Sequence, residues 1–276
     1  MGIRIVQVDA FTNRPFAGNP AGVCILEAPA PEPWMQAVAR EMNLAETAFL
    51  MPREDGYGLR WFTPTVEVAL CGHATLASAH VLWEERRLPD AKQARFHSRS
   101  GLLLADRRGD WIELDFPAKL VSRSEAPPEL LAALGVTAAF IGRNEFDYLV
   151  EVDSEETVRA LAPDFTALRK LPVRGVMVTA RGNADFDFVS RFFAPGSGID
   201  EDPVTGSAHC ALGPYWAERL GKKEFAAYQA SPRGGILRVR VKDDRVLLGG
   251  QAVTILRCEL AAEAGIHDVK GSPVEA

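Results

Sequence analysis

The sequence predicts an α+β fold made of two similar halves, each with a β-sheet and one central helix. Two observations support it: short β-rich segments alternate with a few helical ones, and the order of segments in the first half recurs in the second. The length of 276 residues allows one large or two medium domains, and the 47% hydrophobic content supports a real core.

The first half reads as strands followed by amphipathic or apolar helices. Apolar spacing at Trp34, Val38 and Met42 predicts one helix, and the run after Gly72 predicts a second. Turn signals such as Gly18-Asn19-Pro20 separate the strands. Strands are predicted at 3–11, 21–26, 46–51, 59–63, around Phe96, 101–105 and 111–116, and helices at 31–43 and 73–86.

The second half begins after a polar, proline-punctuated linker at 117–128. Asp153 with Glu156 resembles a capping box that opens a helix ending at Leu161. Strands are predicted at 138–141, 148–152, 173–180, 186–193, 235–242, 246–248 and 252–256, and a helix at 207–220. The predicted domains are 1–117 and 118–261, with 262–276 a candidate addition to the first, and the active site is expected at their interface.

The duplication is visible in the letters. Arg60-Trp-Phe-Thr-Pro matches Arg191-Phe-Phe-Ala-Pro, a loop follows in each half, and Gly72-His-Ala then matches Gly206-Ser-Ala at the start of a helix. The second loop is three residues longer. The same motifs in the same order indicate two related halves.

Charge and apolar content exclude several classes of protein. The net charge is −6 and no Lys/Arg run exceeds two residues, which argues against a nucleic-acid or anionic-membrane surface. No apolar run reaches the ~18 residues of a membrane span, and the N-terminus lacks a signal-peptide core. A cytoplasmic protein is therefore expected.

Cysteine and histidine spacing predicts neither a disulfide framework nor a metal site. The four cysteines are far apart and form no Cys-x-x-Cys motif. His73 and His80 are two helical turns apart, which is too far for one ion.

The two predicted helix starts at Gly72 and Gly206 are candidate anion sites. Free N–H groups and the positive end of each helix dipole stabilise a carboxylate or an enolate-like intermediate without a metal. Glycine lets a ligand approach the backbone closely.

Glu46 is the candidate proton carrier. It lies in the segment 43–49, where a helix ends and an apolar strand begins. Leu44, Ala48 and Phe49 would partly desolvate the carboxylate, which makes it a stronger base. The alternative is a strand-end glutamate in water or in a structural salt bridge.

Four further residues have a functional and a structural interpretation. His73 could donate to a substrate or be a polar first-turn residue, and Ser207 could bind an anion or cap its helix. Asp202 could orient His73 or act as a second acid/base, or it could cap the start of the following helix. Cys71 could be a reactive thiolate at a helix start or a buried inert thiol. The neighbouring acids Asp200 and Glu201 are expected in solvent or in caps.

Taken together, these motifs resemble the PhzF-like (phenazine-biosynthesis) isomerase family, over nearly the whole chain. The segments that carry the resemblance are 18–20, 43–49, 60–64, 71–75 and 201–209.

The resemblance implies a diaminopimelate-epimerase-like fold, with two pseudo-symmetric halves that each curl a sheet round a central helix. It also implies a homodimer without a cofactor that shifts a proton on a small carboxylate-bearing metabolite. Glu46, in the Asn-Leu-x-Glu-Thr-Ala motif, would move the proton, and His73 and Asp202 would be the other catalytic residues. The residues expected to bind substrate are Asn19, Gly72, Gly206 and Ser207.

Two rival functions remain open from the sequence. One is an amino-acid racemase or epimerase that uses Cys71 with a carboxylate. The same fold hosts racemases with two opposed cysteines, but alignment on Thr205-Gly206 places Pro203 where the second thiol is required. The second rival is a non-catalytic protein of this fold that binds a small carboxylate. The sequence argues against an NAD-dependent enzyme, because Gly196-Ser-Gly198 lacks the third glycine and precedes acids that would repel a pyrophosphate.

Overall fold

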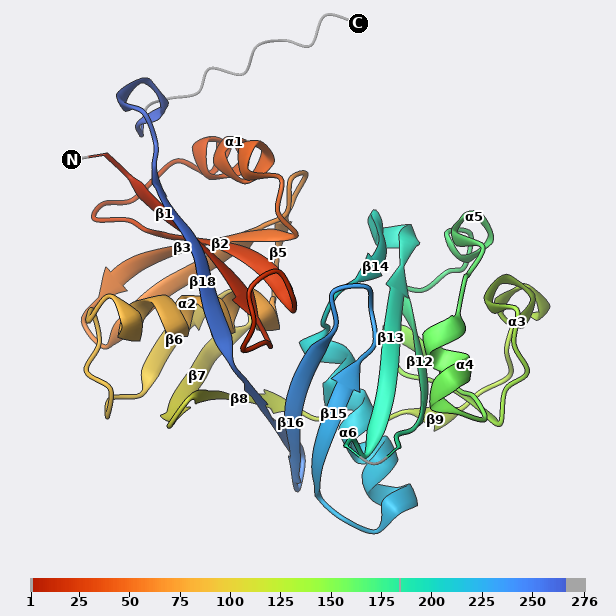
Figure 1. The fold of residues 1–276 in the computed structure, drawn as a ribbon. Coiled ribbons are helices and arrows are strands. Elements are labelled where there is room, and N and C mark those ends of the chain that lie inside the picture. The colour runs from red at the N-terminus through yellow and green to blue at the C-terminus, as the bar shows by residue number, and fades with distance from the viewer. Residues whose placement is uncertain (1, 184, 267–276) are drawn as a thin grey trace, which may run out of the picture. The chain divides into compact units, whose positions relative to one another are not determined.

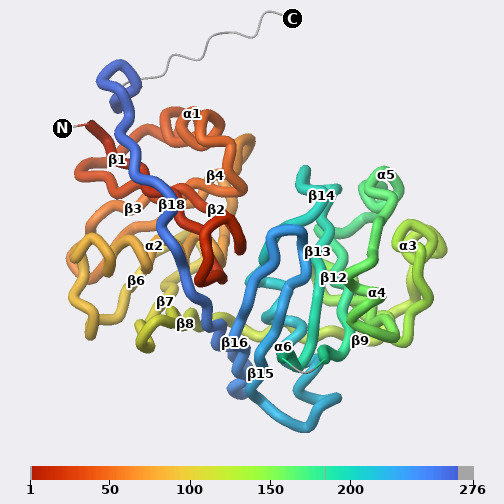
Figure 2. The backbone as a smooth tube through the Cα atoms, viewed as in Figure 1, coloured from red at the N-terminus to blue at the C-terminus, as the bar shows by residue number. Residues whose placement is uncertain are grey.

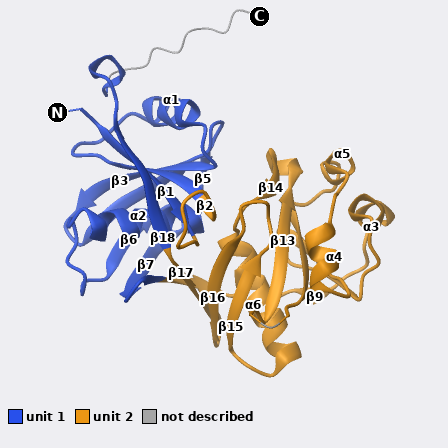
Figure 3. Cartoon of the chain, viewed as in Figure 1, with its two compact units in different colours: residues 1–10, 20–112, 252–276 blue, residues 11–19, 113–251 orange. Residues whose placement is uncertain are grey.

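The chain divides into two compact units. The computed structural model describes residues 2–183 and 185–266, and Figure 1 shows the elements along the chain. Unit 1 comprises Met1–Ala10, Pro20–Ile112 and Ala252–Ala276, and unit 2 comprises Phe11–Asn19 and Glu113–Gln251 (Figure 3). The sequence-based boundaries at 117/118 and 261/262 thus differ from these units, and residues 267–276 of the segment 262–276 lie outside the described residues.

Unit 1 contains a mixed sheet and two longer helices. Its strands are β1 (Arg4–Ala10), β2 (Asn19–Ile25), β3 (Glu46–Arg53), β4 (Gly56–Phe62), β5 (Glu67–Val68), β6 (Ala94–Ser98), β7 (Gly101–Arg108) and β18 (Ala252–Glu259). Its helices are α1 (Glu32–Met42), α2 (Gly72–Glu84) and the 3-10 turn η2 (Ala262–Ala264).

The unit 1 sheet runs in the order β18, β1, β2, β3, β4, β6, β7. β3 pairs in parallel with β2 and antiparallel with β4, and β4 then pairs in parallel with β6. β18 returns from the end of the chain and pairs antiparallel with all of β1, so these distant segments lie side by side (Figure 2). α2 is apolar on all its sides and is buried almost throughout, as expected for a helix enclosed by a curled sheet.

Unit 2 repeats this arrangement. Its strands are β9 (Ser122–Arg123), β10 (Phe140–Arg143), β11 (Asp147–Glu151), β12 (Gly175–Arg181), β13 (Phe188–Ala194), β14 (Ile199–Asp202), β15 (Glu224–Gln229), β16 (Gly235–Lys242) and β17 (Arg245–Gly250), and β8 (Trp111–Pro117) lies at its boundary with unit 1. Its helices are α3 (Pro128–Leu134), α4 (Glu155–Ala160), α5 (Phe165–Leu168), α6 (Gly206–Leu220) and the 3-10 turn η1 (Pro195–Ser197).

The strand pairings show that the sequence repeat is a structural repeat. β12 pairs in parallel with β11 and antiparallel with β13, and β13 pairs in parallel with β15, as β2, β3, β4 and β6 do in unit 1. The short strands β5 and β14 each follow the matched Arg–Pro motif and each precede the central helix, α2 or α6. The predicted duplication is therefore confirmed at the level of strand order and direction.

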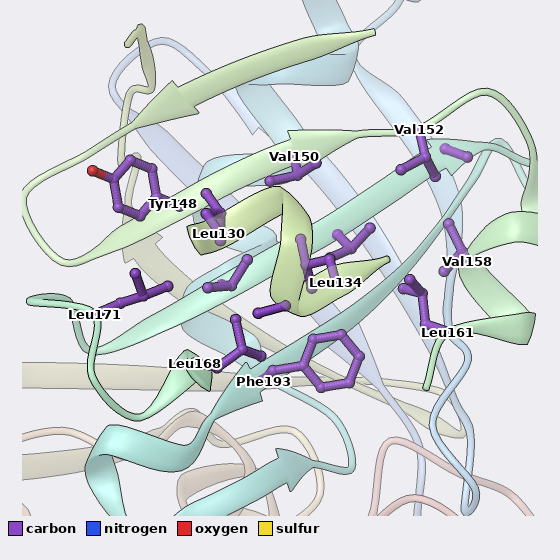
Figure 4. Packing of buried hydrophobic residues seen from close by; sticks show 14 of the residues in the cluster. Leu130, Leu134, Tyr148, Val150, Val152, Val158, Leu161, Leu168, Leu171 and Phe193 are labelled. Carbon is purple, nitrogen blue, oxygen red and sulfur yellow. The ribbon is translucent and has the colours of Figure 1, made fainter. Parts of the chain in front are cut away.

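Each unit has its own apolar core. In unit 2, strands β11, β12 and β13 pack against α3 and α4 through aliphatic side chains and Phe193 (Figure 4). In unit 1, Trp34 of α1 packs edge-on against Phe49 of β3, and Phe49 packs in the same way against Phe62. One of these apolar clusters lies wholly within each unit, in keeping with the division of the chain.

Pro214 lies inside α6 and leaves one helix carbonyl to accept its hydrogen bond from outside the helix. A proline has no N–H, so the Cys210 carbonyl one turn earlier loses its helical partner. The Lys119 backbone N–H donates to that carbonyl at 2.9 Å. The proline therefore creates an attachment point for the linker after β8.

Several local predictions were wrong. The cap of α4 is Ser154, whose hydroxyl accepts from the Thr157 N–H, and not the predicted Asp153–Glu156 box. No prediction covered α3, α5, β5, β9, β14 or β15, and the segment 252–261 was placed in the second half although β18 pairs with β1 of unit 1. Among the described residues, no helix is long and apolar enough to cross a membrane.

Candidate active site

Glu46 is placed by the turn that ends α1. Asn43 adopts a left-handed conformation with φ 49°, which Asn tolerates better than most residues, and its N–H caps the helix by donating to the Ala39 carbonyl. Three residues later the chain enters β3, where Glu46 is the first residue and pairs with Ala21 of β2. The Glu46 side chain is 13% exposed.

Cys71 and His73 lie at the first turn of α2. Cys71 is the N-cap residue with an extended backbone, and the Thr75 hydroxyl donates to its carbonyl at 2.6 Å. Gly72 and His73 follow as the first two helical residues, so their N–H groups have no partner within the helix. Cys71 and His73 are both buried.

The three side chains of unit 1 form a compact cluster. His73 Nε2 lies 3.1 Å from Glu46 Oε2, and His73 Nδ1 lies 3.5 Å from Cys71 Sγ. Glu46 Oε2 is a fully buried atom to which the described residues supply no well-aligned hydrogen bond. This carboxylate oxygen is therefore held close to the imidazole but retains a free lone pair.

The electrostatics of the cluster favour a charged imidazole and a neutral thiol. Burial acts to lower the pKa of His73, but charge on the Cys71 sulfur and the Glu46 carboxylate outweighs it, so that pKa lies well above its ordinary value. Burial, reinforced by the Glu46 charge, raises the pKa of Cys71 to about 11. At neutral pH the thiol is protonated, so of these two negative charges only that of Glu46 acts on the imidazole there.

This result corrects one expectation. Cys71 was a candidate low-pKa thiolate at a helix start, yet burial raises its pKa instead. Burial therefore favours the neutral form of the Cys71 thiol over the thiolate in the absence of a bound cation.

Asp202 is held by a separate cluster in unit 2. It ends β14, and its Oδ1 accepts from Asn19 Nδ2 at 2.7 Å while its Oδ2 accepts from the Thr205 hydroxyl at 2.5 Å. Asn19 also donates to the Val204 carbonyl at 2.9 Å. Two donors on one carboxylate stabilise its ionised form and fix its direction.

Gln229, a residue that sequence reasoning missed, supports this cluster. Its side-chain oxygen accepts from the Thr205 N–H at 2.8 Å, and its amide nitrogen donates to the Asp202 carbonyl at 2.7 Å. Gln229 ends β15 and is fully buried. The available signal is a glutamine at an inward position of an alternating strand, where a buried amide needs specific partners.

The structure groups the predicted site residues into two sets. Glu46, Gly72 and His73 come together in unit 1, and Asn19 and Asp202 come together in unit 2. Gly206 is buried and Ser207 half-buried at the first turn of α6, directly after Thr205.

The helix starts also identify the residue equivalent to Cys71. Cys71 is the N-cap of α2 and Thr205 is the N-cap of α6, so Thr205 takes that place and not Pro203. The conclusion that the second thiol is missing is unchanged. Cys210 lies inside α6, where burial raises its pKa to about 12.

Glu201 is not the solvent or capping residue that the sequence suggested. Arg191 of β13 donates to both of its carboxylate oxygens at 2.7 Å, and both side chains are nearly buried. In unit 1 Arg60 of β4 donates to both oxygens of Glu67 of β5 in the same way. Each pair fastens a short strand ahead of a central helix.

Comparison with known proteins is consistent with this architecture. A family model described as "Phenazine biosynthesis-like protein" matches residues 8–258. An uncharacterized isomerase of Halalkalibacterium halodurans is 55% identical over 258 residues, which cover 93% of this chain and 97% of that protein.

Solved structures of other proteins also resemble the structure of this chain. The crystal structure of a PhzF-family phenazine biosynthesis protein from Enterococcus faecalis superposes with a TM-score of 0.91 at 45% identity, over 95% of this chain and all of that one. A probable proline racemase from Agrobacterium radiobacter reaches a TM-score of 0.65 at 13% identity, over 94% of this chain and 93% of that one, so this likeness concerns the fold alone. The predicted diaminopimelate-epimerase-like α+β fold is confirmed.

Proposed function

Because this chain belongs to the phenazine biosynthesis-like (PhzF) family, we propose that it is an isomerase that moves a proton through Glu46. The observation that carries the proposal is the 3.1 Å contact between Glu46 Oε2 and His73 Nε2 at the start of a buried helix. A carboxylate with a free lone pair can accept a proton, and the adjacent imidazolium and helix N–H groups stabilise negative charge.

The reaction follows from these groups. Glu46 takes a proton from a carbon next to a C=C or C=O group of a small carboxylate, and the electron pair moves into that conjugated system. Positive charge on His73 stabilises the resulting anion. Glu46 then returns the proton to another carbon, so no net proton or electron is exchanged. A carboxylate and an imidazole suffice for these steps, and we propose that no cofactor takes part.

The other site residues, the oligomeric state, the location and the ligand expected from the sequence stay predictions beside this proposal. Asp202 and Ser207 stay predicted contributors to catalysis and substrate binding, and Asn19, Gly72 and Gly206 stay predicted substrate-binding residues. A homodimer in the cytoplasm stays the predicted state of the protein, and a small carboxylate-bearing metabolite stays the predicted ligand, with no nucleic-acid or membrane partner.

Solvent isotope incorporation tests the function. A panel of small unsaturated or keto carboxylates is incubated with the protein in D₂O, and deuterium in recovered substrate and product is measured. Glu46→Gln should abolish incorporation, because the amide cannot accept the proton. Glu54→Gln, at an exposed turn after β3, is the control and should retain it. Full incorporation by Glu46→Gln would refute the proposal.

The same assay separates the rival functions. A racemase that used Cys71 would lose activity in Cys71→Ser, whereas the proposed isomerase should keep most of it. A purely binding protein would retain a carboxylate without exchanging deuterium into it.

A further inference from the structure

The Glu46, Cys71 and His73 side chains bring together three different metal-binding atoms. A sulfur, an imidazole nitrogen and a carboxylate oxygen all lie within 4.8 Å of one another. The spacing of histidines along the chain predicts no metal, because only the fold brings Glu46 of β3 to the start of α2. The fold, not the spacing, creates this donor set.

The distances within the cluster match those round one tetrahedral zinc ion. Zinc bonds of about 2.3 Å to sulfur and about 2.0–2.1 Å to nitrogen or oxygen place S and N about 3.6 Å apart, and N and O about 3.4 Å apart. In the protein, His73 Nε2 lies 4.0 Å from Cys71 Sγ and 3.1 Å from Glu46 Oε2. An ion can therefore be accommodated with shifts of a few tenths of an ångström in these two separations.

A second observation concerns the oxygen itself. Glu46 Oε2 is buried and receives no well-aligned hydrogen bond from the described residues. His73 Nε2 lies 3.1 Å away, and a cation bound between the two atoms would replace the His73 proton and balance the charge of the buried carboxylate. The side chains are also buried, with exposures of 6% for His73 and 13% for Glu46, so bulk water does not compete strongly for the ion.

We propose that these three residues bind one Zn²⁺ ion and that the bound ion switches the enzyme off. Mixed sulfur, nitrogen and oxygen donors favour zinc over Mg²⁺ or Ca²⁺, which prefer oxygen ligands. The ion would occupy the lone pair of Glu46 that accepts the substrate proton. The inhibitory effect rests on the proposed function, whereas zinc binding does not.

Direct metal binding tests the site without any activity assay. The purified protein is titrated with Zn²⁺ against a chromophoric chelator, and with Co²⁺ while the thiolate-to-cobalt absorption band is recorded. We expect one equivalent of each metal and a clear band. Mg²⁺ should give no response.

Cysteine variants provide matched controls. Cys71→Ala should raise the zinc Kd by about 100-fold or more and abolish the cobalt band, because one of three ligands is lost. Cys210→Ala removes another buried free thiol, in α6, and should leave both unchanged. Circular dichroism of Cys71→Ala, with Cys71→Ser as a second variant, verifies that the loss is not unfolding.

Activity then tests the inhibition. Zinc should abolish deuterium incorporation by the wild-type protein and EDTA should restore it, while whatever activity Cys71→Ala shows without zinc should not fall when zinc is added. Stoichiometric zinc binding that is insensitive to Cys71→Ala, or no cobalt band, would overturn the site. Zinc binding without inhibition in an active enzyme would overturn the switch.

Discussion

The side chains that matter for the proposed chemistry are held by hydrogen bonds to residues that do no chemistry themselves. Thr205 is the clearest case, since its hydroxyl donates to Asp202 Oδ2 while Gln229 fixes its backbone N–H. An ionised carboxylate with a short hydrogen bond has a defined direction, which a small substrate requires.

Replacing Thr205 with valine keeps its shape and removes the donor. If Asp202 takes part in the reaction, Thr205→Val should lower kcat/KM by roughly 10- to 100-fold, because a hydrogen bond to a charged group contributes about 1.5–3 kcal/mol. Steady-state kinetics on an accepted substrate measures the effect. Thr137→Val, an exposed-loop threonine of the same unit, is the control. Thr205→Ser should restore much of the activity, and equal losses in serine and valine variants would contradict a hydrogen-bonding role.

His209 should make the stability of unit 2 depend on pH. Its imidazole is fully buried and stacks on Phe188, and burial lowers its pKa from 6.5 to about 4 although its contact with the Thr205 carbonyl opposes this. Below pH 6.5 the unfolded chain therefore binds a proton that the folded chain does not, and stability falls as the pH falls. The loss should reach about 3 kcal/mol near pH 4, since each pKa unit corresponds to about 1.4 kcal/mol.

Urea unfolding of wild type and His209→Gln between pH 7 and pH 4 measures this contribution. The glutamine can donate to the same carbonyl but does not titrate, so the free energy of unfolding of the variant should fall less steeply. Equal slopes for the two proteins would contradict the assignment.

The residues closest to the proposed chemistry could be predicted from the sequence, but the residues that hold them by hydrogen bonds or ion pairs could not. Glu46 and His73 lie in recognisable local motifs, and the structure places them in contact. Gln229 comes from a strand 24 residues beyond Thr205, and only the fold brings their side chains together. For the same reason the Glu201 carboxylate looked exposed in the sequence, because its partner Arg191 is on another strand.

At the scale of the elements, each central helix follows a short strand fastened by an arginine–glutamate pair. In unit 2 this pair is nearly buried, and Arg191 also donates to the Leu161 carbonyl at 2.7 Å. The equivalent Arg60 in unit 1 is 32% exposed and shares its charge with Glu32 as well as Glu67. The two pairs therefore occupy the same place in the repeat but differ in solvent access.

Removing the charge of Glu201 should strongly destabilise unit 2. Glu201→Gln leaves the Arg191 guanidinium buried without its counter-charge, which costs about 3–5 kcal/mol. Asp200→Asn is the matched control, because Asp200 is adjacent, 54% exposed and paired with a 57% exposed Arg169. It should change stability by less than about 1 kcal/mol. Chemical denaturation of both variants gives the comparison, and similar losses would show that burial does not set the effect.

At the element level most strands and longer helices follow from periodicity, with ends shifted by a few residues. The missed elements have physical reasons. α5 is a four-residue helix, and the short strands β5, β9 and β14 have two to four residues, so they carry too few positions for a pattern. β18 begins as a short apolar run, and nothing in its own letters shows that its partner is β1.

For the whole molecule, unit 1 depends on a strand encoded at the far end of the chain. β18 pairs with every residue of β1, and the Leu260 N–H donates to the Ile3 carbonyl. Without β18, β1 would be an unpaired edge in an otherwise complete sheet.

A chain that ends at Gln251 should therefore lose the fold of unit 1 and keep that of unit 2. Hydrogen exchange followed by mass spectrometry should show rapid exchange of α2 amides and slow exchange in β12 and β13. Leu256→Lys, a 40% exposed position on β18, is the control and should keep α2 protected. Protected α2 amides in the truncated chain would contradict this dependence.

The path of β18 also sets an order of events during synthesis. Every strand of unit 2 precedes β18 in the chain, whereas β1 lacks its antiparallel partner until β18 has been made. The sheet of unit 1 is thus completed only after the last strand of unit 2 exists. A released chain that ends before residue 252 would contain all these strands of unit 2 and would leave the open edge of β1 for chaperones to bind.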